Sequence, residues 1–269
     1  MKMVSAATIA RIAAPAPGTQ VLRRAHDMLR LLALHAREGM RLSDIASTLS
    51  LEPPTAHRIL QGLVQERMAV QDVDKRYNLG PALYELGMTA GASYPLRDVV
   101  QTSVEHLAKT TGDTLVVTVR SGLDSVCIER RTGAFPIQTS MVAIGTRRPL
   151  ASGAGGLAIM ACLDKDESRW LVEQNALQLK CSAADIAARI EDARRIGYAI
   201  NTYRHTTPPI SALGVPIMGA FGQCVAGLAI VALSMRLSGK RRTEVVELLR
   251  NEAVAVSRRL AQQVLPKAI

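Results

Sequence analysis

Hydrophobic residues recur every three to four positions in three consecutive segments near the start of the chain, which is the spacing of one buried helix face. The first segment, residues 19–38, predicts a support helix that ends at Gly39. The other two segments, residues 42–49 and 53–64, predict short helices joined by a tight turn at residues 50–52. Two short helices at this separation are typical of a helix-turn-helix.

The second of these short helices has one apolar side and one polar side. It opens on Pro53 and Pro54, which suit the first helical positions because the N–H that proline lacks has no partner there. Ser43 is expected to cap the first short helix, at residues 42–49. We expect the second helix to be a DNA recognition helix, although such helix pairs also serve as plain packing units. Its polar side presents groups of the kinds that reach base edges and phosphates: Thr55, His57, Arg58 and Gln61.

A β-hairpin is predicted directly after this helix. Residues 69–71 and 76–79 read as strands, and the polar residues 72–75 between them read as a turn. In this position the hairpin is the wing of a winged helix-turn-helix, and its basic residues are expected to contact phosphates. The predicted DNA-binding residues are Arg41, Ser43, Pro54, Thr55, His57, Arg58, Gln61, Lys75 and Arg76.

A further apolar helix is predicted over residues 81–90, and the residues up to Pro95 break it. A short apolar helix between two domains is either a dimer contact or a cover for the wing. A dimer is expected on geometry, because one winged helix contacts one half-site of an operator. The candidate residues for this contact are Leu83, Leu86 and Met88.

The remainder of the chain alternates between helical and strand periods, which predicts an α/β layer. Short turns between the strands favour an antiparallel sheet. Ser182 and Asp185 occupy the positions of a capping box at the start of one helix, which ends at Gly197. The predicted elements are a helix at 96–111, strands at 114–120, 125–130 and 137–142, a helix at 157–163, a helix at 182–197, a segment at 208–217 leading into a strand, a strand at 224–233, and a helix at 243–264.

Composition and charge are compatible with two ordinary domains. The chain has 269 residues, of which 48% are hydrophobic and 21% are charged. The net charge of +10 fits a nucleic-acid partner. Residues 1–95 hold 11 Lys and Arg against 8 Asp and Glu, so only +3 of the charge lies there. The remaining positive charge either keeps the protein surface soluble or adds an electrostatic field that faces DNA.

The four cysteines are widely separated, with no CxxC pair and no Cys/His cluster at metal spacing. We therefore expect a reduced, cytoplasmic protein without a metal or another cofactor. Arg11 and Pro15 interrupt the small apolar residues at the N-terminus, which predicts a tail rather than a signal peptide. No apolar stretch of about 20 residues is free of charge, so no membrane span is expected. The predicted domains are a flexible tail (1–18), a winged helix-turn-helix (19–80), a linker helix (81–95) and an α/β domain (96–269).

A glycine-rich loop at residues 145–156 runs into the apolar helix predicted at residues 157–163. Bare backbone N–H groups at such a junction hold an anion such as a carboxylate, although such loops are also simple tight turns. The loop contains neither GxxxxGK nor GxGxxG, so it has neither of those nucleotide-binding patterns.

Two motifs resemble the IclR family of bacterial transcriptional regulators. The segment Leu51-Glu-Pro-Pro-Thr-Ala-His-Arg-Ile-Leu60, followed by Tyr77-Asn-Leu-Gly80, is similar to the DNA-binding domain of that family. The loop with Gly145, Arg147 and Pro149 is similar to the loop of its effector domain. The resemblance covers residues 19 to about 265. It implies a two-domain α/β protein with an N-terminal winged helix-turn-helix and a GAF-like effector domain with an antiparallel sheet.

The resemblance also implies a function: a regulator that binds a double-stranded DNA operator and senses a small organic acid. It implies a dimer or a dimer of dimers, with RNA polymerase as a further candidate partner. Ala229 and Val231 stand where hydroxyl groups occur in family members that bind very small acids, so we expect a carboxylate with an apolar or aromatic body. A packed core without a ligand would explain the same residues. The implied effector-binding residues are Leu150, Ser152, Gly153, Ala154, Asn201, Ser211, Leu228, Ala229 and Val231.

The competing function is a thiol-dependent enzyme. Cys224 and His205 supply a thiol and a base, but no nucleophile elbow or acid–base set surrounds either residue in the sequence. A cysteine in an apolar strand is usually a small hydrophobic residue. A DNA-binding protein without ligand control would not need so large a second domain. A regulator without enzymatic activity is therefore the preferred interpretation.

Overall fold

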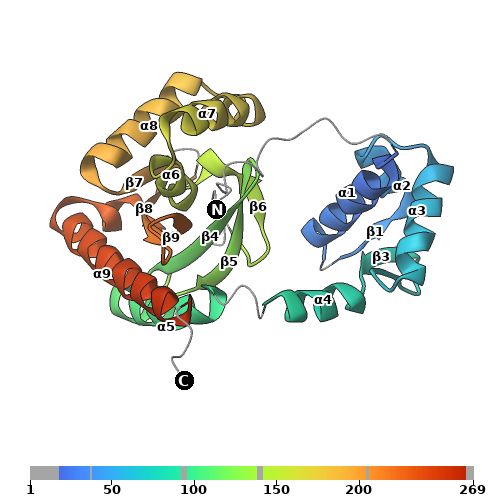
Figure 1. Cartoon of the computed structure of the whole chain (residues 1–269), viewed down its shortest axis with the longest axis horizontal. Coiled ribbons are helices and arrows are strands. Elements are labelled where there is room, and N and C mark those ends of the chain that lie inside the picture. The colour runs from blue at the N-terminus through green and yellow to red at the C-terminus, as the bar shows by residue number, and fades with distance from the viewer. Residues whose placement is uncertain (1–17, 37, 92–95, 138–141, 204–205, 265–269) are drawn as a thin grey trace, which may run out of the picture. The chain divides into compact units, whose positions relative to one another are not determined.

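The computed structural model describes residues 18–36, 38–91, 96–137, 142–203 and 206–264. The chain divides into two compact units, Met1–Tyr94 and Pro95–Ile269 (Figure 1). Within the described residues, no helix is long and apolar enough to cross a membrane.

The first unit packs its helices around a small three-stranded sheet in the order β1-β3-β2. The predicted helix-turn-helix and hairpin are confirmed. Tyr77 lies at the centre of the unit, opposite Met40 in the antiparallel β1–β3 pair, and only 2% of its surface is exposed. The elements are α1 (Gln20–Leu34), β1 (Met40–Arg41), α2 (Leu42–Thr48), α3 (Pro53–Gln65), β2 (Ala69–Gln71), β3 (Arg76–Leu79) and α4 (Pro81–Gly91).

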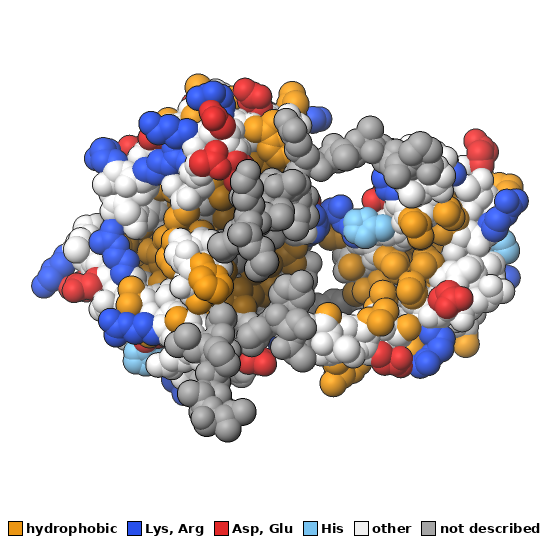
Figure 2. Space-filling model, in the orientation of Figure 1, with side chains coloured by type: hydrophobic (Ala, Val, Ile, Leu, Met, Phe, Trp, Pro, Cys, Tyr) orange, Lys and Arg blue, Asp and Glu red, His pale blue; other side chains and the backbone are white. Residues whose placement is uncertain are grey.

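The structure corrects two expectations about this unit. The support helix α1 ends at Leu34 rather than at Gly39, and its first turns are not buried: Val21 and Leu22 are 56% and 67% exposed. Figure 2 shows hydrophobic side chains gathered over this region. Ser43 does not cap α2, because the cap position belongs to Arg41 and the Ser43 hydroxyl donates to Asp44 instead.

The second unit is a six-stranded antiparallel sheet in the order β6-β5-β4-β9-β8-β7. Helices α5 and α9 cover one face, and α6, α7 and α8 cover the other (Figure 1). The helices are α5 (Leu96–Thr111), α6 (Ala154–Ala161), α7 (Lys165–Leu179), α8 (Ala183–Ile196) and α9 (Gly239–Val264). The strands are β4 (Thr114–Ser121), β5 (Asp124–Arg131), β6 (Arg147–Pro149), β7 (Ala199–Tyr203), β8 (Ile210–Met218) and β9 (Cys224–Leu233).

Several of these elements differ from the prediction. Helix α6 begins at Ala154, three residues before the predicted start, so the last three residues of the glycine-rich segment are helix rather than loop. Strand β6 and a 3-10 turn at Leu150–Ser152 occupy the preceding residues. Helix α7 and strand β7 were not predicted. The strand expected at residues 137–142 lies largely outside the described residues.

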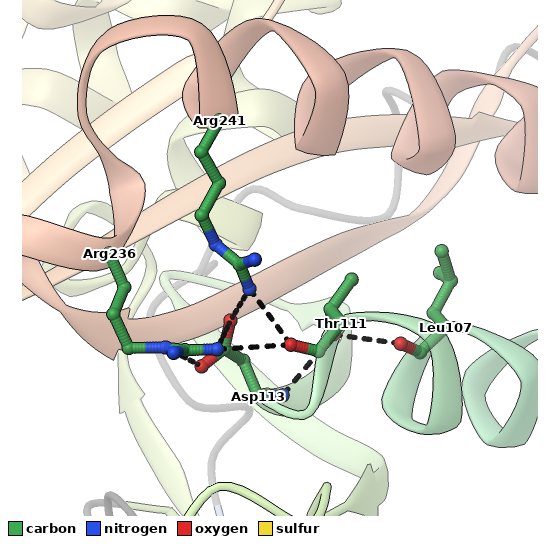
Figure 3. Close-up of polar contacts among 5 residues, drawn as sticks. All are labelled: Leu107, Thr111, Asp113, Arg236 and Arg241. Carbon is green, nitrogen blue, oxygen red and sulfur yellow. Dashed lines mark hydrogen bonds and ion pairs between the residues drawn. The ribbon is translucent and has the colours of Figure 1, made fainter.

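A buried ion-pair network joins the end of α5 to the start of α9 (Figure 3). The carboxylate of Asp113, in the turn between α5 and β4, accepts hydrogen bonds from Arg236 at 2.7 Å and from Arg241 at 2.8 Å. Both arginines also donate to the carbonyl oxygen of Thr111. The guanidinium group of Arg236 lies 3.7 Å from the ring centroid of Phe135. The network therefore fixes the helical layer made by α5 and α9.

Candidate functional site

The exposed side of α3 carries the polar residues that the sequence assigns to DNA recognition. His57 and Arg58 are exposed, whereas Thr55 and Gln61 are half-buried. The Gln61 amide nitrogen lies 3.5 Å from Nε2 of His57, one helical turn away. The opposite side of α3 buries Ala56, Leu60 and Leu63 in the core of the unit. Packing thus holds α3 with its polar side toward solvent.

The hairpin adds basic groups to the same unit. The backbone N–H group of Asp74 and that of Arg76 both donate to the Asp72 carboxylate, which fixes the turn. The Lys75 side chain in this turn is exposed. Arg76 also donates to the carbonyl oxygen of Gly39 at 3.3 Å, so part of its guanidinium group holds the segment before β1. Arg76 is therefore a structural residue as well as a predicted phosphate contact.

The remaining predicted DNA-binding residues also lie on the surface. Arg41, Ser43 and Pro54 are exposed. Arg41 stands directly opposite Arg76 in the β1–β3 pair. Like charges at opposed strand positions are destabilising without a counterion, so this pair of arginines favours an anionic partner.

The second unit contains a cavity beside the first turn of α6. It has a volume of about 30 Å³, enough for about two water molecules, so a larger ligand requires its walls to move. Strands from the whole width of the sheet contribute to it because their alternate residues face α6. The cavity is lined by Thr114, Val116, Thr118, Ser125, Arg130, Val142, Arg148, Gly153, Ala154, Gly155, Gly156, Tyr203, Ala212, Ala229 and Val231.

Four of the predicted effector-binding residues line this cavity: Gly153, Ala154, Ala229 and Val231. Leu150 and Leu228 do not, and their assignment to the wall is wrong. Leu150 is buried with the residues of α7 and α8. Leu228 precedes Ala229 on β9, so its side chain points to the opposite face of the sheet, where it packs with residues of α5 and α9.

The polar side chains predicted to bind the effector make hydrogen bonds within the protein. The Asn201 amide donates to the Ser152 carbonyl oxygen at 3.0 Å and accepts from Arg189 at 2.8 Å. The Ser211 hydroxyl lies 2.8 Å from that of Ser234. Asn201 and Ser211 therefore support the turn before α6 and the start of β8. The buried Ser152 hydroxyl has no hydrogen-bond partner among the described residues.

The sequence interpretation missed the charged part of the cavity. Arg130 and Arg148 both line it, and its described lining contains no Asp or Glu. Arg130 stands opposite Val116 in the β4–β5 pair, and Arg148 stands opposite Ser125 in the β5–β6 pair. These pairings join distant parts of the chain, so no local pattern in the sequence shows them.

Two thiols of this unit, Cys127 and Cys224, have raised pKa values, whereas the hydrogen bond with Cys224 lowers the pKa of Cys162. Burial, and then the charge of Glu129, raise the pKa of Cys127 to about 11. The pKa of Cys224 is also raised, first by a hydrogen bond with Cys162 and then by burial. A protonated thiol is a poor nucleophile, and His205, the proposed partner of Cys224, lies outside the described residues. No group of three or more His, Cys, Asp and Glu with the arrangement of a metal site occurs among the described residues.

Comparison with known proteins assigns both units. Residues 21–73 match the family described as IclR helix-turn-helix domain, and residues 88–258 match that described as Bacterial transcriptional regulator IclR C-terminal. The glycerol operon regulatory protein of Streptomyces coelicolor is 32% identical over 247 residues, which cover 90% of this chain and 96% of that protein.

Solved structures show the same fold. An IclR transcriptional regulator from Alicyclobacillus acidocaldarius aligns with a TM-score of 0.74 at 23% identity, over 91% of this chain and 99% of that chain. An IclR homologue from Microbacterium hydrocarbonoxydans, solved in complex with 4-hydroxybenzoate, aligns with a TM-score of 0.71 at 20% identity, over 90% of this chain and 100% of that chain. With a helix-turn-helix in its first unit and a C-terminal domain match that spans more than half of its length, the chain belongs to the IclR family of bacterial transcriptional regulators.

Proposed function

We propose that this regulator binds its operator through α3 and the hairpin, and that an organic acid with an apolar or aromatic body controls it by binding in the cavity beside α6. The observation that carries the proposal is the cavity lining, in which the described residues combine two arginines with an apolar wall and include no Asp or Glu. The Microbacterium homologue, which was solved with the aromatic acid 4-hydroxybenzoate, supports an effector that carries a carboxylate on an aromatic body.

The walls of the cavity indicate how such an acid would act. Val116, Ala212, Ala229 and Val231 form an apolar surface, and the first turn of α6 presents backbone N–H groups beside it. Because the cavity has a volume of only about 30 Å³, an acid must shift its walls to bind. A ligand that favours one arrangement of these walls shifts the protein toward that arrangement, which is the requirement for control by an effector.

Replacing Arg58 by Ala should weaken operator binding by about 1–3 kcal/mol if the exposed guanidinium group reads a base or an ordered phosphate. The measurement is a gel-shift titration with an operator fragment selected from random DNA by the wild-type protein. Arg169→Ala is the matched control, because Arg169 is an exposed arginine of α7 in the other unit. Unchanged operator affinity in a folded Arg58→Ala variant would exclude α3 as the recognition helix.

The same titrations test the effector when carboxylic acids are added. Benzoate, 4-hydroxybenzoate or hexanoate should change the operator affinity of the wild-type protein, and pyruvate should not, because its ketone oxygen would face the apolar wall without a partner. An effect of pyruvate alone would refute the proposed effector class.

A dimer is part of the proposal, and α4 is its proposed contact. Leu86 and Met88 are 58% and 62% exposed. Their simultaneous replacement by Glu should shift the protein toward the monomer in light scattering, because two charges would be buried at an apolar contact. Val73→Glu is the control, since Val73 is 98% exposed in the turn of the hairpin. A wild-type protein that is monomeric at working concentration would contradict this assignment.

A further inference from the structure

The neighbouring residues Arg147 and Arg148 lie in different surroundings: Arg148 lines the cavity beside α6, and Arg147 does not. Arg147 donates to Asp124 at 2.7 Å and to Ser121 at 2.8 Å, which makes it part of the edge of the sheet. Arg148, the next residue of β6, faces the cavity. A Cβ atom added to Gly153 would lie 3.6 Å from Nη2 of Arg148. The guanidinium group of Arg148 therefore lies beside the first turn of α6.

Among the described residues, no carboxylate pairs with the positive charge of Arg148. The internal segments outside the described ranges, residues 37, 92–95, 138–141 and 204–205, contain no Asp or Glu. Arg148 is also half-buried, and a half-buried charge without a counterion loses hydration without compensation.

The surroundings of Arg148 add to the attraction for an anion. The backbone N–H groups at the start of α6 carry a partial positive charge. The Tyr203 hydroxyl lies close by, 3.7 Å from the position of a Cβ atom at Gly153, and donates to the Ser152 carbonyl oxygen. The apolar residues Val116 and Ala229 lie further along the same cavity. A charged end and an apolar end thus meet in one site.

We propose that Arg148 binds the carboxylate group of the effector and selects acids over neutral molecules of the same shape. This inference rests on the proposed function, since it assigns a residue to the proposed effector site. A guanidinium group presents two parallel N–H donors to a carboxylate, and such charge-assisted pairs are stronger than hydrogen bonds between neutral groups. The hydrocarbon body of the acid then lies against the apolar wall.

The test compares 4-hydroxybenzoate with its neutral analogue 4-hydroxybenzamide by calorimetric titration of the full-length protein. Arg148→Gln should raise the Kd for the acid by about 10- to 100-fold, the range for loss of a charged hydrogen bond. The Kd for the amide should stay within about twofold, because the amide makes no ion pair. Arg148→Lys should recover part of the acid affinity, since it restores the charge without the paired donors.

Controls separate this role of Arg148 from a structural one. Arg169→Gln removes the same charge from an exposed position on α7 and should leave both Kd values unchanged. Equal losses for acid and amide in Arg148→Gln would show that Arg148 acts through packing, and no loss for either would show that another group binds the carboxylate; both results overturn the inference. If none of benzoate, 4-hydroxybenzoate and hexanoate binds the wild-type protein, the proposed effector class fails, and the inference fails with it.

Discussion

Replacing Asp113 by Ala should lower the free energy of unfolding of the second unit by about 3 kcal/mol, near the lower end of the range for breaking a buried ion pair from one side. The Asp113 side chain is 2% exposed and binds two arginines (Figure 3). Its removal leaves Arg236, which is 21% exposed, with a positive charge that water reaches poorly. Arg241 is 39% exposed and can turn toward solvent, so we expect the lower end of the range.

The single tryptophan makes this effect measurable in one unit. Trp170 lies in α7, so its fluorescence during denaturation by urea reports the second unit separately from the first. Asp166→Ala is the matched control, because Asp166 is 90% exposed and its ion pair with Arg169 should contribute less than about 1 kcal/mol. A loss no larger for Asp113→Ala than for this control would show that the network does not stabilise the contact between α5 and α9.

The parts of the fold that the sequence predicted are those governed by local chemistry. Helix α5 has the predicted bounds Leu96–Thr111, because its apolar period and the following Gly112 are both local. Helix α8 begins as predicted, with the Ser182 hydroxyl accepting the N–H of Asp185. Strand β1 has only two residues and forms by pairing with β3, so no periodic pattern could reveal it.

The residues that line the cavity are set by strand pairing between separate parts of the chain, which a local sequence pattern does not show. Arg130 faces the cavity because β5 pairs with β4, with an irregularity in the pairing between Val117 and Thr118. A prediction from the sequence needs that register, which long-range packing sets. The error at Leu228 is different, because Leu228 and Ala229 are neighbours on one strand and cannot both face the same side. Strand alternation alone would have prevented it.

Replacing Gly227 by Ala should lower the free energy of unfolding of the second unit by about 3 kcal/mol, at the upper end of the usual range for overpacking. A Cβ atom at Gly227 would lie 2.1 Å from the carbonyl oxygen of Gly155, so the backbones of β9 and α6 are in direct contact. The contact involves backbone atoms, which cannot move aside as a flexible side chain can. Fluorescence of Trp170 during urea denaturation measures the effect.

The same substitution should also weaken binding of 4-hydroxybenzoate, because α6 must move away from β9 and its first turn forms part of the cavity wall. Gly87→Ala is the matched control: no atom lies within 4 Å of a Cβ atom at Gly87, which belongs to the first unit, so this change should leave the Trp170 transition and the affinity for the acid unchanged. If Gly227→Ala is as stable as the wild-type protein and binds the acid equally well, α6 does not rest on β9 as the structure shows. A stable variant with weakened binding would instead indicate that α6 moves at little energetic cost, which would identify this helix as the mobile wall of the effector site.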